Sequence, residues 1–345
     1  MATGLLQARN LLNQNHLMSK VLLLNHSELE QCVPLDMSAI QCVEESFKIL
    51  ATESVIMPPI MQLDVRENNG EVCIKTAYLP GLDSFAIKIS PGFFDNPKIG
   101  LPSGSGMMNV FNSKTGVLEA VLLDKGYLTD VRTAAAGAVA AKWLSRAESR
   151  CAAIIGAGVQ ALLQLKALLL VREIEQVTVW ARDGERAVEF ANKASTETGV
   201  VISVADTVNE ACADADIIVT TTPSENPLVQ FQDLHPGQHI TAMGADSERK
   251  SELDPWIIAG ADRYVCDRLS QVRALGDLHR AIQEGVIPAD KNFDELGQVI
   301  AGQVPGRESD DQITICDLTG TGAQDTAIAT HALKLAVDRG LGQLF

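Results

Sequence analysis

The chain has 345 residues, of which 46% are hydrophobic, and a formal net charge of −16 at pH 7. This length and composition predict a globular protein with two packed cores. Because nucleic acids and anionic membranes repel an acidic surface, neither is expected as a partner. The seven cysteines are scattered and have no C-x-x-C spacing, which argues against a zinc site or a disulfide framework and favours a cytoplasmic location.

The N-terminal segment predicts a leader followed by a helix. Residues 1–18 lack the basic start and apolar stretch of a signal peptide, and Met18 offers a second start, so we expect a flexible leader. Ser38 and Gln41 resemble a capping box for a helix that ends near Glu53. Four apolar residues would form the buried face of this helix: Ile40, Val43, Phe47 and Leu50.

The next segment alternates like antiparallel strands. Strands are expected at 60–65, 71–79, 84–90, 107–111 and 117–123. If the strands that flank the turn at 79–83 pair symmetrically, Lys75 lies opposite Lys88. Since like charges paired across strands are destabilising, this register predicts an anionic group, such as a substrate carboxylate, between the two ammonium groups. The alternative is a register slip that points one lysine to solvent.

Arg132 follows Thr129, which resembles the N-cap of an alanine-rich helix that extends to about Leu144. A cation in the first turn opposes the helix dipole, so its presence there predicts a carboxylate or phosphate bound by Arg132 and the free N–H groups. The alternative is a salt bridge from Arg132 to Asp124 or Asp130.

A strand ending at Ile155 leads into a G-x-G-x-x-A turn, formed by Gly156, Gly158 and Ala161. Gly156 permits the tight turn, Gly158 lets the backbone approach a pyrophosphate, and Ala161 lets the following helix pack closely on the strand. A helix through Leu170 and a strand at 177–180 complete a βαβ unit. The alternative is an ordinary strand-to-helix turn. The next residues, Arg182 and Asp183, offer a guanidinium for the 2′-phosphate of NADP and a carboxylate for the ribose of NAD.

Strands and helices then alternate to about residue 318, which predicts a doubly wound α/β domain. Ligands in such folds collect at the carboxyl ends of strands, and two ends stand out. One is the threonine-rich end at Thr222, and the other contains Met243, Gly244 and Asp246. We interpret Asp246 as functional, with a turn-capping aspartate as the alternative.

The remaining motifs do not indicate other chemistry. The six histidines, His16 and His239 among them, have no metal-ligand spacing, so no metal is expected. Ser247 and Lys250 form an isolated S-x-x-K match that we interpret as chance. After a break at 318–322, a final helix at about 324–338 is expected to return to the first domain.

The chain resembles the ornithine cyclodeaminase/mu-crystallin family from about Lys20 to its C-terminus. The matching segments are Ala86–Ser90, Leu128–Ala136, Gly156–Ala161, Gly244–Asp246 and Lys250–Leu253. The resemblance implies a Rossmann domain at 129–323 and an α+β substrate-binding and dimerisation domain at 19–128 plus 324–345. It therefore also implies a homodimer.

By this resemblance, Lys88 and Asp246 are the catalytic residues, and Arg132 binds a substrate carboxylate. The resemblance also gives cofactor-contact positions, which are Thr133, Gly158, Val159, Gln160, Thr222, Thr319 and Gly320. The glycine turn and the strand ends add the remaining cofactor-binding residues, which are Gly156, Ala161, Arg182, Asp183, Met243 and Gly244. Relatives often carry an arginine near the end of the Pro-Pro segment, where this chain has Met61. Amino-acid binding as in ornithine cyclodeaminase does not follow from this pattern.

Lys75 and the segment 91–97 look like the ectoine-utilisation cyclodeaminase subgroup, which is similar to iminosuccinate reductases. With Lys75 and Arg132 as two carboxylate grips, the sequence favours an imine reductase that converts iminosuccinate to L-aspartate, with NAD(H) preferred and NADP(H) as the alternative. The rival hypotheses are cyclisation of L-ornithine to L-proline, another ketimine reductase or amino-acid dehydrogenase, and a nucleotide-dependent binding protein like mu-crystallin.

Overall fold

The structure is a computed structural model that describes residues 20–345, so the predicted leader at 1–18 and His16 lie outside the described residues. Contacts divide the chain into two compact units. Unit 1 contains the described residues up to Pro34, together with Val55–Thr129 and Asp325–Phe345, and unit 2 contains Leu35–Ser54 and Asp130–Gln324. Within residues 20–345, every helix is too short or too polar to cross a bilayer.

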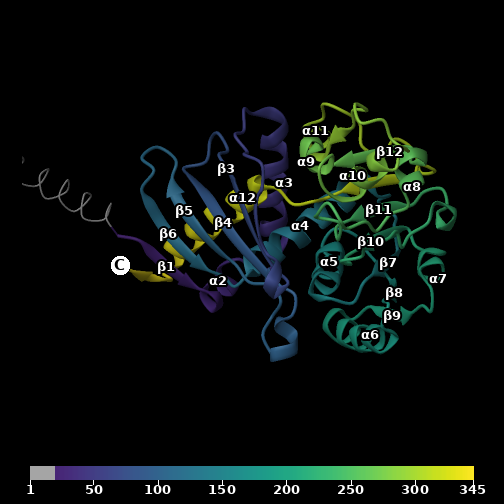
Figure 1. The fold of residues 1–345 in the computed structure, drawn as a ribbon, viewed down its shortest axis with the longest axis horizontal. Helices are drawn as coiled ribbons and strands as arrows, with labels where there is room; N and C mark the ends of the chain where they lie inside the picture. Colours follow the sequence, from purple (N-terminus) through teal and green to yellow (C-terminus); the bar gives the residue numbers. More distant parts are fainter. Residues whose placement is uncertain (1–19) are drawn as a thin grey trace, which may run out of the picture. The chain divides into compact units, whose positions relative to one another are not determined.

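Unit 1 is built on a sheet with strand order β15-β1-β6-β5-β4-β3-β2 (Figure 1). The chain from β2 to β6 is antiparallel throughout, as the alternating pattern predicts, while β1 runs parallel to β6. The elements are β1 (Leu22–Asn25), α2 (His26–Cys32), β2 (Met61–Val65), η1 (Arg66–Asn68), β3 (Gly70–Ala77), β4 (Ser84–Phe93), η2 (Asn96–Ile99), β5 (Met107–Asn112), β6 (Leu118–Leu123) and β15 (Gln343–Leu344).

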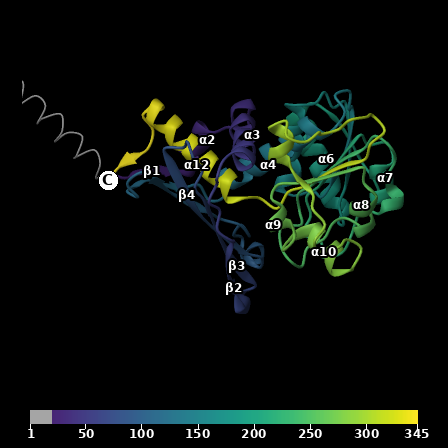
Figure 2. The same ribbon diagram turned by 90° about the horizontal axis from the view of Figure 1, so that it is seen from above.

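Helix α12 (Gly322–Arg339) packs on this sheet (Figures 1 and 2). Its Thr326 hydroxyl accepts a hydrogen bond from Ala86 N (3.1 Å) in β4 and donates one to Ala77 O (2.9 Å) in β3. Figure 2 shows β2 and the adjoining part of β3 extending beyond α12. Residues 325–339 of the final helix thus belong to unit 1.

Unit 2 is a parallel sheet with strand order β13-β12-β14-β11-β10-β7-β8-β9. Its strands are β7 (Cys151–Ile155), β8 (Gln176–Trp180), β9 (Val201–Val204), β10 (Ile217–Thr220), β11 (His239–Ala242), β12 (Arg263–Cys266), β13 (Asp294–Glu295) and β14 (Thr314–Asp317). Its helices are α3 (Met37–Thr52), α4 (Tyr127–Leu144, which begins in unit 1), α5 (Val159–Leu169), α6 (Gly184–Thr198), α7 (Val208–Cys212), η3 (Phe231–Asp233), α8 (Pro255–Gly260), α9 (Leu269–Val272), α10 (Gly276–Gln283) and α11 (Leu296–Ile300).

Helices cover both faces of this sheet, which makes it doubly wound. On one face, Ile154 and Val179 pack with α5 and α6, and on the other Ile155 and Ile240 pack with α7, α8 and α10. Neighbours along one strand alternate between faces, so Ile154 and Ile155 serve different cores, and all the residues of β10, β11 and β14 are buried. The predicted α/β Rossmann-type fold with a second sheet domain is confirmed.

The start of α3 differs from the prediction. Its N-cap is Asp36, whose carboxylate accepts hydrogen bonds from Ser38 N (2.9 Å) and Ala39 N (3.0 Å), so the expected Ser38–Gln41 capping box is wrong. Aspartate caps as well as serine, and an ionised carboxylate also interacts favourably with the helix dipole. The four residues predicted for the buried face are all buried.

Candidate active site

The predicted lysine pair of unit 1 is present. Strands β3 and β4 pair in the register that places Lys75 opposite Lys88. Lys75 is half-buried, whereas Lys88 is only 2% exposed. The Lys88 Nζ atom lies 3.0 Å from each carboxylate oxygen of Asp325, which is fully buried in the first turn of α12. This ion pair stabilises the charged form of Lys88 within the sheet.

Asp325 was not singled out in the sequence. An acidic residue in the first turn of a helix is common because of the helix dipole, so the position alone carries no functional signal. The charge of Lys88 also acts on the pKa of a second buried acid, Asp124. Burial raises the pKa of Asp124, while hydrogen bonds from backbone N–H groups and the Lys88 charge oppose that rise.

Helix α4 begins two residues earlier than predicted, which changes the setting of Arg132. Asp124 accepts a hydrogen bond from Leu128 N (2.9 Å), and α4 begins at Tyr127, so Thr129 is inside the helix rather than its N-cap. Arg132 therefore lies in the second turn, and the expectation that it opposes the dipole of the first turn is wrong. A better reason to single out Arg132 is its burial, because it is only 5% exposed.

The guanidinium of Arg132 packs against the backbone at Gly320. A side chain at position 320 would place its Cβ 2.4 Å from Arg132 Nη1, and this nitrogen also lies 3.4 Å from Gln324 Oε1. The φ angle of Gly320 is +79°, which favours glycine as well. Arg132 and the predicted Thr319–Gly320 loop are therefore neighbours in unit 2.

That loop is positioned by Asp267, which directly follows β12. Its carboxylate accepts hydrogen bonds from Gly320 N (2.7 Å) and Thr319 Oγ1 (3.2 Å). Gln271 donates from its amide to Thr319 Oγ1 (2.7 Å) and Gly320 O (2.9 Å). Asp267 and Gln271 were not predicted, because nothing in the local pattern connects them with a loop about fifty residues further along the chain.

The glycine turn adopts the predicted strand–turn–helix geometry. Gly156 has a φ of +123°, and a Cβ there would lie 2.5 Å from Thr221 Oγ1, whereas a Cβ at Gly158 meets no atom within 4 Å. Gly158 is the N-cap of α5 and provides no side-chain acceptor for the N–H groups of the first turn. Val159 is 67% exposed and Ala161 is fully buried. The N-terminus of α5 is thus an open set of N–H donors, suited to a phosphate group.

Three other predicted cofactor positions have structural contacts of their own. Gln160 donates to Asp130 Oδ1 (2.9 Å), and the carbonyl of Thr133 accepts from Gln164 Nε2 (2.9 Å), so both tie α5 to α4. Asp183 is the N-cap of α6 and accepts from Glu185 N (3.1 Å) through Oδ1. The neighbouring residue Arg182 is exposed at the end of β8.

The strand ends at Thr222 and Gly244 meet at one buried carboxylate, Glu252. Its Oε1 accepts from Thr222 N (2.5 Å) and Thr222 Oγ1 (2.6 Å), and its Oε2 accepts from Gly244 N (2.7 Å). A Cβ at position 244 would lie 2.3 Å from Thr222 O, which explains glycine there. Next to Gly244, Met243 is buried with 9% exposure. Sequence reasoning matched Glu252 only as part of a family segment and gave it no role.

Asp246 is exposed, and its Oδ1 lies 2.5 Å from Lys250 Nζ in an ion pair. The Lys250 of the S-x-x-K match is therefore the partner of the predicted acid. This pair places a carboxylate and an ammonium just beyond the carboxyl end of β11, where ligands of doubly wound sheets bind.

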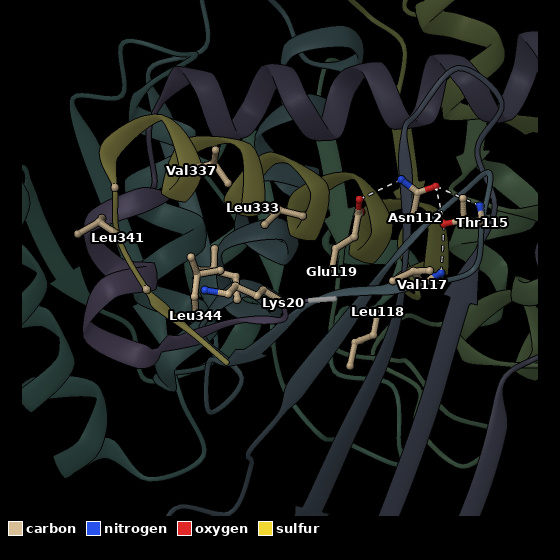
Figure 3. A pocket seen from close by; sticks show the side chains of 13 residues that line it. Lys20, Asn112, Thr115, Val117, Leu118, Glu119, Leu333, Val337, Leu341 and Leu344 are labelled. Atoms are coloured by element: carbon tan, nitrogen blue, oxygen red, sulfur yellow. Dashed lines mark hydrogen bonds between the residues drawn. The ribbon is translucent and has the colours of Figure 1, made fainter. Parts of the chain in front are cut away.

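Unit 1 also contains a cavity of about 730 Å³, lined largely by the end of α12, β15 and the turn between β5 and β6. Figure 3 shows Leu333 and Val337 on one side of it and Glu119, whose carboxylate accepts from Asn112 Nδ2 (3.0 Å), on another. The residues around this cavity differ from the predicted site residues. It is therefore separate from the candidate active site.

A glycine turn on a doubly wound sheet and a buried lysine on a second sheet define the class of this protein. The chain belongs to the ornithine cyclodeaminase/mu-crystallin family, whose model matches residues 19–338. It is 56% identical over 328 residues to a putative dehydrogenase of Rhizobium meliloti, covering 95% of this chain and 99% of that protein.

Two solved structures are similar over nearly the whole chain. One is an archaeal alanine dehydrogenase dimer with bound NAD, which is 34% identical in sequence to this chain. The alignment covers 94% of this chain and 99% of the dehydrogenase chain, with a TM-score of 0.88. The iminosuccinate reductase of Paracoccus denitrificans in complex with NAD⁺ is 29% identical, with the same coverage and a TM-score of 0.86. The family predicted from the sequence is confirmed.

Proposed function

We propose that this protein is an NAD(H)-dependent imine reductase that converts iminosuccinate to L-aspartate. The observation that carries this proposal is the cross-strand pair of Lys75 and Lys88, which sets Lys75, the ligand of one substrate carboxylate, opposite Lys88, the group that protonates the imine. Buried Arg132 is the further carboxylate ligand, since a guanidinium binds a carboxylate through two parallel hydrogen bonds.

The residues present fit a dinucleotide. The N-terminus of α5 offers N–H donors, and the space beside Gly158 lets a pyrophosphate approach the backbone. When bound, the nicotinamide supplies the hydride that reduces the carbon of the C=N bond. The NAD bound by the two similar solved structures supports NAD(H), and Arg182 keeps NADP(H) as the alternative.

Lys88 is the proposed proton donor to the substrate nitrogen. The reaction consumes one proton with the hydride, so the imine nitrogen becomes an amine and NADH becomes NAD⁺. A protonated imine accepts hydride more readily than a neutral one, and Asp325 keeps the Lys88 ammonium charged for this task. Asp246, paired with Lys250, orients the nitrogen or relays its proton.

The test is a substrate comparison with the purified protein. Oxaloacetate with excess ammonium supplies the imine, and loss of NADH absorbance together with chromatographic detection of L-aspartate measures its reduction. L-Ornithine with NAD⁺, followed by detection of L-proline, tests the cyclodeaminase alternative. Aspartate formation supports the proposal; proline formation, or preferred reduction of the imine of pyruvate, contradicts it.

We also propose that the protein acts as a homodimer in the cytoplasm, as the family resemblance implies. The dimeric state of the similar archaeal alanine dehydrogenase supports the first part. Light scattering coupled to size-exclusion chromatography measures the mass, and a monomer at assay concentration would contradict it.

A further inference from the structure

Strands β10 and β11 separate just where their predicted cofactor-binding residues begin. Their ladder pairs Thr220 with Ala242 and ends there. Two residues beyond, at Thr222 and Gly244, the Glu252 carboxylate accepts hydrogen bonds from both segments. One side chain therefore takes the place of the missing ladder contacts and sets the spacing of the two strand ends.

The segment held by Glu252 also contacts the glycine turn. Thr221 N donates to Ile155 O (2.9 Å), and Thr221 Oγ1 occupies the space that a Cβ on Gly156 would need. A displacement of Thr222 would therefore be transmitted through Thr221 to the turn at the N-terminus of α5. This turn is the proposed pyrophosphate site.

Glu252 is itself fixed from behind. Its backbone N donates to Asp277 Oδ1 (2.8 Å), and its carbonyl accepts from Leu228 N (2.7 Å). With the side chain fully buried and its backbone bound on both sides, the carboxylate has little freedom to follow a moving strand end.

We propose that Glu252, in its ionised form, is a positioning residue for the cofactor: it fixes the Thr222 and Gly244 segments at the spacing that the dinucleotide requires. This inference rests on the proposed NAD(H) dependence. It adds that cofactor affinity depends on the charge of Glu252. The oxygens of this side chain accept hydrogen bonds from backbone and hydroxyl donors of the protein itself.

The protonation of Glu252 gives the proposal a distinctive signature. Burial and, after it, the nearby Asp277 charge raise the pKa of Glu252, while the hydrogen bonds from Thr222 lower it; together they bring this pKa to about 7. The charged group that faces it is Asp277 of α10, whose own pKa burial raises to about 6; the Thr222 and Gly244 segments present neutral donors. A protonated carboxyl oxygen cannot accept as an ionised one does, so NADH affinity should fall as the pH drops through about 7.

The experiment measures the Kd of NADH by titration calorimetry on both sides of pH 7. Glu252→Gln keeps the shape but replaces one acceptor oxygen with a donor, so its Kd should rise about tenfold at the higher pH and lose its pH dependence. Glu252→Asp keeps the charge but is one methylene shorter, so it should bind weakly and retain a pH dependence.

Glu295→Gln is the matched control. Glu295 also accepts from a backbone donor, Leu269 N (2.9 Å), but at β13, so this variant should keep the wild-type Kd and pH profile. Wild-type affinity that does not change with pH, or a Glu252→Gln variant that matches the wild type, overturns the inference and leaves the proposed function standing. Failure of the wild type to bind NADH overturns both. If Glu252→Gln melts at the assay temperature, the wild-type profile and Glu252→Asp decide.

Discussion

The two units bury carboxylates in different ways. In unit 1, the fully buried Asp325 is neutralised by the ammonium of Lys88, which lies 3.0 Å from both of its oxygens. In unit 2, the fully buried Glu252 is surrounded by the neutral N–H and O–H donors of Thr222 and Gly244. The first arrangement balances charge with charge, and the second spreads one charge over several dipoles.

This difference matches the chemistry proposed for each unit. A cation next to an anion stays charged, so Lys88, whose charge Asp325 balances, is suited to supplying a proton. A carboxylate without a cationic partner has a raised pKa, which for Glu252 is about 7; its proposed role is to position two backbone segments while it is ionised. The buried acid of unit 1 therefore supports a charged side chain, Lys88, and the buried acid of unit 2 supports the backbone segments at Thr222 and Gly244.

The largest expected effect comes from breaking the ion pair of unit 1. Asp325→Ala leaves Lys88 buried without its counter-ion, which should lower the free energy of unfolding by about 3–5 kcal/mol in urea denaturation. Lys88→Met/Asp325→Leu removes both charges and should recover most of that loss.

The exposed pair of Lys98 and Asp95 is the control, because solvent screens it; Asp95→Asn should leave the urea midpoint unchanged. A single Asp325→Ala variant as stable as the wild type would show that Lys88 does not depend on Asp325 for its burial.

Lys88→Met tests whether the charge of unit 1 is catalytic. Removing a general acid should reduce imine turnover about 100-fold or more, while the Kd of NADH stays unchanged because Lys88 belongs to the other sheet. Stopped-flow measurement of NADH oxidation and calorimetric binding give the two readouts.

The same substitution also leaves Asp325 without its cation, so Lys88→Met/Asp325→Asn is assayed beside it to separate misfolding from lost chemistry. Wild-type turnover in either variant would remove Lys88 from the mechanism.

Much of the fold was predictable because its signals are local. The register that pairs Lys75 with Lys88 follows from a short turn, and the βαβ unit follows from a glycine turn between a strand and a helix. The starts of α3 and α4 were missed because other acids accept from their first turns: Asp36 is the N-cap of α3, and Asp124 accepts a hydrogen bond from Leu128 N of α4. In the sequence, Ser38 and Thr129 are equally good cap residues.

The candidate site was predictable only in part, for a related reason. Lys75, opposite Lys88, and the glycines of the turn are unusual where they stand, so the sequence draws attention to them, whereas Arg132 was singled out for a first-turn position that it does not hold. Asp325, Asp267 and Glu252 are ordinary acidic residues. Each has a partner far away in the chain, such as Gly320 for Asp267 and Thr222 for Glu252. Contacts of this kind depend on the tertiary fold, and a single sequence carries no local signal for them.

Gly158→Ala should affect stability far less than Asp325→Ala, and it tests whether the cofactor is bound through the backbone of unit 2. Gly158 has a φ of −93°, which alanine adopts without strain, and a Cβ there meets no atom within 4 Å, so the free energy of unfolding should change by less than about 1 kcal/mol. The added methyl group would nevertheless occupy the space of the pyrophosphate, and the Kd of NADH should rise about tenfold or more.

Gly156→Ala is the contrasting variant, because its φ of +123° and its contact with Thr221 predict a clear loss of stability as well. If Gly158→Ala binds NADH as tightly as the wild type, the dinucleotide does not approach the backbone at α5. Cofactor binding by the backbone N–H groups of unit 2 would then be contradicted.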